Sequence, residues 1–229
     1  MKYMIHACPQ RMWYVEEFLV PSIAEQGITE KDIVIWNDSG GKGNLFSCMD
    51  AFKECGKHEG GTWHLQDDVI ICREFAKRTQ EADENMITCG FACEKFESAV
   101  GKLRERCWGD HRVQQMWYSF QCILIPNYLA GECADWFYDD ASKRKENQIR
   151  VQDGKYDDEF WRMFLLEKHG RMRMMNLKPN LVDHIDYLIG GTIVNKQRLY
   201  NESRAYYFED IDLVSELEEK LIHRNKKWG

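Results

Sequence analysis

Residues 63–72 read Trp63-His64-Leu65-Gln66-Asp67-Asp68-Val69-Ile70-Ile71-Cys72, an apolar run typical of a buried strand that two adjacent acids interrupt. An ionised carboxylate is costly to remove from water unless it is paired or bound to a cation. Carboxylate oxygens are also the ligands that hard divalent cations prefer. Asp67 and Asp68 therefore predict a cation site at a strand end, and an enzyme as the first hypothesis. A turn or a helix cap is the structural alternative for this pair.

The residues before this run alternate between strand and helix patterns. Strands are expected over 3–8, over 32–36 and up to the acids, and helices over 11–24, where Pro21 bends or shortens the helix, and from an Asn44 cap to Cys55. Strands joined by such crossovers form a Rossmann-type sheet, whose ligands sit outside the carboxyl ends of the strands. The sequence therefore predicts an α/β fold with a mostly parallel central sheet flanked by helices, and it places the acids at the ligand edge.

The second half of the chain predicts further elements of both kinds. A helix is expected over 73–84, strands over 86–91 and 119–125, and helices over 131–139, 157–168 and 211–223. In the 157–168 helix one face is apolar and consists of Phe160, Trp161, Phe164 and Leu165.

Composition narrows the class of protein. A chain of 229 residues with 44% hydrophobic residues is expected to form one domain, and a net charge of −7 argues against a broad basic face for nucleic acid. Nine cysteines without an apolar leader indicate reduced thiols in the core of a cytoplasmic protein. No apolar run is long enough to predict a membrane span.

A second motif lies far downstream. The run Pro179-Asn180-Leu181-Val182-Asp183-His184-Ile185-Asp186 is followed by Gly190-Gly191-Thr192. Together with Gln66-Asp67-Asp68 after two βα units, it resembles the glycosyltransferase superfamily of the GT-A fold, and most of all its small phage or bacterial members. The resemblance runs from Tyr3 to about Thr192 and rests on the order and spacing of the motifs.

The resemblance implies a single GT-A-like domain over 1–229. A nucleotide-binding half covers about 1–92, a half that completes the acceptor and metal sites covers about 93–195, and a C-terminal helix covers about 211–224. A phage-encoded member would work in the cytoplasm of its host.

The resemblance also implies a metal site. Asp68 matches the acid that ligates the metal, Asp67 the neighbour that assists donor binding through water or a sugar hydroxyl, and His184 the late ligand. An imidazole ligand favours Mn²⁺ over Mg²⁺. The alternative for His184 is a local hydrogen bond that caps a turn.

The resemblance also places the nucleoside near the ends of the first two strands. Cys8, Pro9 and Arg11 follow the first strand and Asn37 and Asp38 the second, so these are the candidates for donor contacts. For Arg11, a contact with a phosphate is the alternative to a contact with the nucleoside. Residues 37–41 also form a good turn sequence without any ligand.

Asp158, and next to it Asp157, stands where related enzymes present a catalytic base at a helix start. An inverting transfer needs such a base to take the proton of the acceptor hydroxyl, whereas a retaining enzyme does not. Helix capping is the structural alternative for both acids.

The function expected from these motifs is a metal-dependent transfer of a sugar from a nucleotide-diphosphate sugar, first of all a UDP-sugar, by a hexosyltransferase. The acceptor is left open among a glycan, a protein, a small molecule and a modified DNA base. The alternatives are a metal-dependent phosphoesterase or nucleotidyltransferase on the same residues, and a non-catalytic module that binds sugar nucleotides.

Overall fold

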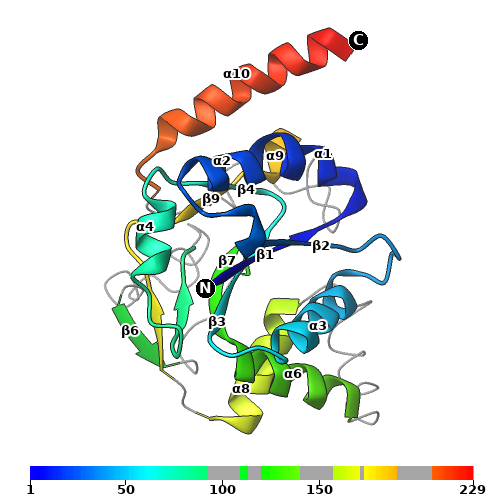
Figure 1. Cartoon of the computed structure of the whole chain (residues 1–229), viewed down its shortest axis with the longest axis vertical. Coiled ribbons are helices and arrows are strands. Elements are labelled where there is room, and N and C mark those ends of the chain that lie inside the picture. The colour runs from blue at the N-terminus through cyan, green and yellow to red at the C-terminus, as the bar shows by residue number, and fades with distance from the viewer. Residues whose placement is uncertain (92–108, 113–119, 140–156, 171–172, 190–207, 229) are drawn as a thin grey trace.

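The computed structural model describes residues 1–91, 109–112, 120–139, 157–170, 173–189 and 208–228 (Figure 1). The central sheet of this described part has seven strands. They are β1 (Lys2–Ala7), β2 (Ile33–Asn37), β3 (Gly61–Gln66), β5 (Ile87–Cys89), β6 (Gly109–Arg112), β7 (Cys122–Pro126) and β8 (Arg173–Asn176). Their order in the sheet is β2-β1-β3-β7-β5-β8-β6.

The sheet is mostly parallel. β1 pairs in parallel with β2 and with β3, so that Ile5 lies opposite both Ile35 and Leu65. β7 runs antiparallel to both β3 and β5, β8 runs parallel to β5, and β6 runs antiparallel to β8. All strands except β7 and β6 therefore point the same way. This confirms the predicted α/β fold with a mostly parallel central sheet flanked by helices.

The alternation of side chains along each strand divides the apolar residues into two cores. Tyr3 and Ile5 of β1 point into a core with the N-terminal helical segment, whereas Met4 points into a core with three helices on the other face. These three helices are α3 (Asn44–Cys55), α6 (Asn127–Asp139) and α8 (Asp157–Lys168). Figure 1 shows them gathered on one side of the sheet.

The N-terminal helical segment continues past Pro21 where the sequence predicted a bend or an end. It consists of η1 (Pro9–Arg11), α1 (Met12–Tyr14), the π-helical turn η2 (Val15–Leu19) and α2 (Val20–Glu25). A proline lacks the N–H of the helical ladder and crowds the carbonyl four residues before it. The wider turn, in which the Val20 N–H bonds the Val15 carbonyl, lies directly before Pro21 and lets the helix run on.

α6 begins at Asn127, four residues before the predicted start at Gly131. The Asn127 N–H donates to the Gly60 carbonyl at 2.8 Å, so the helix starts as soon as β7 ends. Gly131 lies inside the helix because α3 crosses there: a Cβ on Gly131 would lie 3.0 Å from the Cα of Gly56. The glycine is needed for close helix packing and does not mark a helix boundary.

The other predicted elements are present with shifted ends, except the one over 157–168, whose bounds and buried face are confirmed. α4 (Phe75–Gln80) is shorter than the helix predicted over 73–84. α10 (Ile211–Trp228) is longer than predicted, and it buries Val214, Leu217 and Leu221.

α10 packs beyond the N-terminal helices, on the far side from α3, α6 and α8 (Figure 1). Arg224 ion-pairs with Glu17 at 3.0 Å and lies 4.0 Å over the ring of Trp13. Arg73 pairs with Asp210 at 2.8 Å, just before the helix begins. Within the described ranges, no helix combines the length and the apolar character that crossing a bilayer requires.

The cysteines behave as core residues. Those described are free thiols, and all except the half-buried Cys8 are buried; they are Cys8, Cys48, Cys55, Cys72, Cys89, Cys122 and Cys133.

Candidate active site

The two acids form the turn at which the chain leaves the central sheet. β3 ends at Gln66, and β4 (Val69–Ile71) pairs antiparallel with β9 (Val182–His184) in a separate two-stranded sheet. Val69 lies opposite His184 in this ladder, and the N–H of Ile185 donates to the carbonyl of Asp68 at 2.8 Å. The register of β4 and β9 therefore brings His184 beside Asp68, although more than one hundred residues separate them.

Asp68 and His184 face each other in the interior. Their side chains are 7% and 2% exposed, and Asp68 Oδ2 lies 3.1 Å from His184 Nε2. In the described part of the chain, Asp68 Oδ1 and His184 Nδ1 have no hydrogen-bond partner. Buried polar atoms of this kind are costly and rare, so they point to a ligand that completes them.

The charges of this cluster support one another. Burial alone would raise the pKa of Asp68, but His184 and Arg11 hold it well below its ordinary value. Burial likewise opposes protonation of His184, yet the Asp68 carboxylate raises the pKa of the imidazole. In this structure Asp68 is therefore held as an anion by Arg11 and His184.

Arg11 supplies a permanent positive charge beside Asp68. It is buried, and its Nη1 donates to Asp67 Oδ1 at 2.8 Å and also to Asp68 Oδ2. The Cys8 N–H donates to Asp67 Oδ2 at 2.7 Å. Both oxygens of Asp67 are thus engaged, one by a guanidinium and one by the backbone at the end of β1.

The arrangement of Asp68 and His184 fits a divalent cation. Two neighbouring ligands of an octahedral ion, with bonds of about 2.1 Å at right angles, lie about 3 Å apart. The 3.1 Å between Asp68 Oδ2 and His184 Nε2 is the length of their ion pair and is also compatible with this separation, and the unpartnered Asp68 Oδ1 adds a further oxygen. The described residues hold no group of three or more candidate ligands. Phosphate oxygens of a substrate commonly complete a site with few protein ligands.

The predicted nucleoside contacts lie at the same edge of the sheet. Cys8 and Pro9 follow β1, Asn37 ends β2, and the Asp38 N–H donates to the Ala7 carbonyl at 2.9 Å. Pro9 and Asn37 are exposed, and Cys8 is half-buried. These positions form one rim beside the acid turn.

Asp38 also has a structural task. Its carboxylate accepts hydrogen bonds from the N–H groups of Lys42 and Gly43, each at 2.9 Å, and so closes the loop before α3. Gly43, with φ of +89°, occupies the N-cap position. Asn44 is the first helical residue, so its predicted role as the cap was wrong; only the glycine accepts this backbone conformation without strain.

α8 runs antiparallel to α6. Phe160, near the start of α8, packs against Phe137 near the end of α6 with ring centroids 5.2 Å apart, and His169 pairs with Glu132 nearer the start of α6 at 2.9 Å. α6 begins beside the first residue of β3. The start of α8 therefore lies at the opposite edge of the sheet, where β3 ends.

Asp157 and Asp158 are the first two residues of α8. The structure thus places both at the edge of the sheet that carries Asp67 and Asp68, and it leaves Asp158 half-buried. α8 belongs to the core on the α3 face, whereas β9 packs on the other face. The role of these two acids as a catalytic base stays a prediction.

A contact between the half-buried His6 and the buried His64 was not expected from the sequence. His6 Nε2 lies 2.8 Å from His64 Nδ1, on neighbouring strands β1 and β3 just before the site. Burial lowers the pKa of His6 to about 4 and that of His64 well below its ordinary value, so both rings are neutral. Alternation along the two strands was the only sequence signal for this pair, and it places both rings on the face that Phe52 covers.

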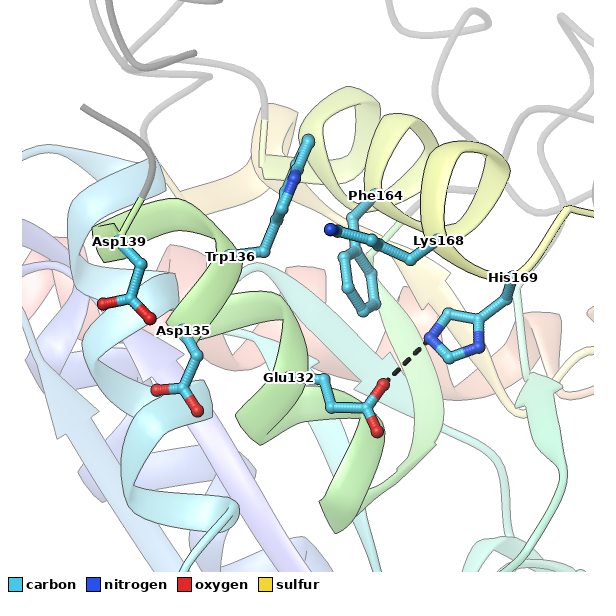
Figure 2. Close-up of a pocket in the computed structure, with 7 residues that line it drawn as sticks. All are labelled: Glu132, Asp135, Trp136, Asp139, Phe164, Lys168 and His169. Atoms are coloured by element: carbon cyan, nitrogen blue, oxygen red, sulfur yellow. Dashed lines mark ion pairs between the residues drawn. The ribbon is translucent and has the colours of Figure 1, made fainter. Parts of the chain in front are cut away.

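A separate pocket of about 610 Å³ lies between α6 and α8. Figure 2 shows three carboxylates along α6 and the Lys168 and His169 side chains reaching in from α8, with the Glu132–His169 ion pair across one end. Its lining residues are Glu132, Asp135, Trp136, Asp139, Phe164, Lys168 and His169. None of the predicted site residues lines this pocket.

Two solved structures are similar to this chain over nearly its whole length. One is an active-site mutant of LgtC, with a TM-score of 0.48, 12% identity, and 98% of this chain and 96% of that chain covered. Another is the galactosyltransferase LgtC in complex with donor and acceptor sugar analogs, with a TM-score of 0.43, 9% identity and 96% of each chain covered. No protein-family model and no curated protein sequence matches the chain. At these identities and TM-scores the similarity transfers no residue roles to this chain.

Proposed function

We propose that this chain is a metal-dependent glycosyltransferase that transfers a sugar from a nucleotide-diphosphate sugar to an acceptor hydroxyl. The observation that supports this function is the buried pairing of Asp68 with His184, which leaves Asp68 Oδ1 and His184 Nδ1 without hydrogen-bond partners among the described residues. A UDP-sugar is the first candidate donor, and a hexosyltransferase reaction the first candidate class.

Asp68 and His184 would hold the cation, and the imidazole favours Mn²⁺ over Mg²⁺. When bound, the cation neutralises the charge that develops on the departing diphosphate. Arg11 brings a further positive charge to the same place, and its planar guanidinium suits phosphate oxygens. Asp67 holds Arg11 and the end of β1 in position.

The remaining predicted residues would lie at the periphery of the site. Cys8, Pro9, Asn37 and Asp38 would form the nucleoside rim at the ends of β1 and β2. Asp158, or Asp157 beside it, would take the proton of the acceptor hydroxyl if the transfer inverts the anomeric centre.

The domain division belongs to the same proposal. Residues 1–92 would bind the nucleotide and 93–195 would complete the acceptor and metal sites. The acceptor class is a glycan, a protein, a small molecule or a modified DNA base.

Product analysis tests the proposal. The protein is incubated with Mn²⁺, a panel of UDP-sugars and a panel of acceptors, and the nucleotide products are separated by chromatography. Free UDP with a glycosylated acceptor is expected from the wild type and not from Asp68→Asn. Asp83→Asn removes an exposed carboxylate whose hydrogen bonds, among the described residues, stay within its own turn, so it should keep full activity.

Other products would contradict a glycosyl transfer. Release of UMP would identify a phosphoesterase or nucleotidyltransferase on the same residues. Binding of UDP-sugars without turnover across the whole panel would identify a non-catalytic module.

A further inference from the structure

Arg11 occupies the position of a counter-cation between the two acids. Its Nη1 contacts both carboxylates, and it shares Asp68 Oδ2 with His184 Nε2. We infer that Arg11 competes with the divalent cation for Asp68 and gives up this carboxylate when a diphosphate binds, so that metal and donor bind with positive coupling. This inference rests on the proposed function.

Burial makes the competition strong. The side chains of Arg11, Asp67, Asp68 and His184 are each at most 8% exposed, so water screens their charges little. A divalent cation on Asp68 and His184 would sit beside a guanidinium of like charge. In the absence of phosphate, Arg11 therefore lowers the affinity of the site for metal.

In this scheme Asp67 holds Arg11 in position. One of its oxygens accepts from Arg11 and the other from the Cys8 N–H, so the carboxylate anchors the guanidinium to the end of β1. Phosphate oxygens offer Arg11 a bidentate partner in exchange for Asp68. This exchange frees Asp68 Oδ2 for the cation when the negatively charged diphosphate binds.

The coupling is reciprocal by thermodynamic necessity. If UDP raises the affinity for Mn²⁺ by some factor, Mn²⁺ raises the affinity for UDP by the same factor. Replacement of Arg11 by a neutral residue removes the competitor and should weaken this coupling.

The test measures Mn²⁺ binding directly, by the electron paramagnetic resonance signal of the free ion. Titrations are made with and without UDP, on the wild type and on Arg11→Gln, with correction for the Mn²⁺–UDP complex. Without UDP, Arg11→Gln should bind Mn²⁺ at least about tenfold more tightly than the wild type. UDP should raise the Mn²⁺ affinity of the wild type by a larger factor than that of the variant.

Arg73→Gln is the matched control, because it removes an arginine that pairs with Asp210 and Asp212 away from the site. Its Mn²⁺ affinity should equal that of the wild type. If the wild type and Arg11→Gln bind Mn²⁺ with equal affinity in the absence of UDP, the inference is overturned. The proposed function still stands in that case, provided that both proteins bind Mn²⁺ in the presence of UDP. Failure of both proteins to bind Mn²⁺ with UDP would overturn the proposed function itself.

If Arg11→Gln does not fold, the titrations of the wild type alone test the inference. A gain of Mn²⁺ affinity of about tenfold with UDP supports the inference. Tight Mn²⁺ binding that UDP does not change overturns it.

Discussion

Replacement of Asp67 by asparagine tests whether this carboxylate is committed to holding Arg11. Asp67 is buried, and it accepts one hydrogen bond from Arg11 Nη1 at 2.8 Å and one from the Cys8 N–H at 2.7 Å. Asparagine keeps the shape but offers only one acceptor oxygen. Whichever way the amide is turned, its NH₂ group faces a donor, either the guanidinium of Arg11 or the backbone of Cys8.

The expected loss of stability follows from these two contacts. An unpaired buried donor costs about 1–3 kcal/mol, and removal of one member of a buried ion pair costs about 3–5 kcal/mol. Arg11 keeps Asp68 as a partner, which places the expected loss at about 3 kcal/mol, the low end of the ion-pair range. For a chain of this length, about 2–4 °C of melting temperature is lost per kcal/mol, so Asp67→Asn should melt about 6–12 °C lower.

Thermal melts followed by circular dichroism, with urea unfolding as a second measure, give the result. Asp83→Asn is the control, since Asp83 is exposed and should lose no more than about 0.5 kcal/mol. If Asp67→Asn melts within about 2 °C of the wild type, the carboxylate does not hold Arg11, and the account of Asp67 as its anchor is refuted.

Three further predictions concern the scaffold. Gly56→Ala should lose at least about 1–3 kcal/mol, because its Cβ would lie 2.5 Å from the Cα of Gly131; a urea midpoint equal to that of the wild type would contradict the close crossing of α3 and α6. The unfolded chain binds more protons than the folded one between pH 6.5 and about 4, since burial lowers the pKa of His6 to about 4. Stability should therefore fall on acidification through this range, by up to about 1.4 kcal/mol per pH unit for each imidazole. Urea unfolding from pH 7 to pH 4.5 should show a flatter loss in His64→Gln, and an unchanged slope would speak against the neutral pair. Arg73→Gln should cost at most about 1 kcal/mol by the same measurement because its ion pairs are exposed, and a loss above about 2 kcal/mol would show that they hold α10.

The local sequence pattern was sufficient to predict much of the scaffold. The parallel strands β1, β2 and β3 and the apolar face of α8 follow from alternation and from helical spacing, which depend on neighbours a few residues away. Gly131 shows where such patterns fail: it lies inside a helix because another helix crosses it, and no nearby residue reveals that contact. Pro21 is similar, since a π-helical turn before it keeps the helix intact.

The site was predictable in part. The family resemblance implied that Asp68 and His184 belong together, and the pairing of β4 with β9 brings them to 3.1 Å. The burial of Arg11 between the two acids was missed, because an arginine after a strand is equally suited to phosphate and to a carboxylate. The His6–His64 contact was missed because it depends on the register of two strands far apart in the sequence.

The central claim is that Asp68 and His184 hold one cation together. Pulsed electron paramagnetic resonance of Mn²⁺ bound in the presence of UDP tests it most directly, because a coordinated imidazole nitrogen modulates the echo of the ion. The wild type should show this nitrogen coupling, His184→Gln should lose it, and the exposed control His58→Gln should keep it. Bound Mn²⁺ without nitrogen coupling in the wild type would contradict the claim.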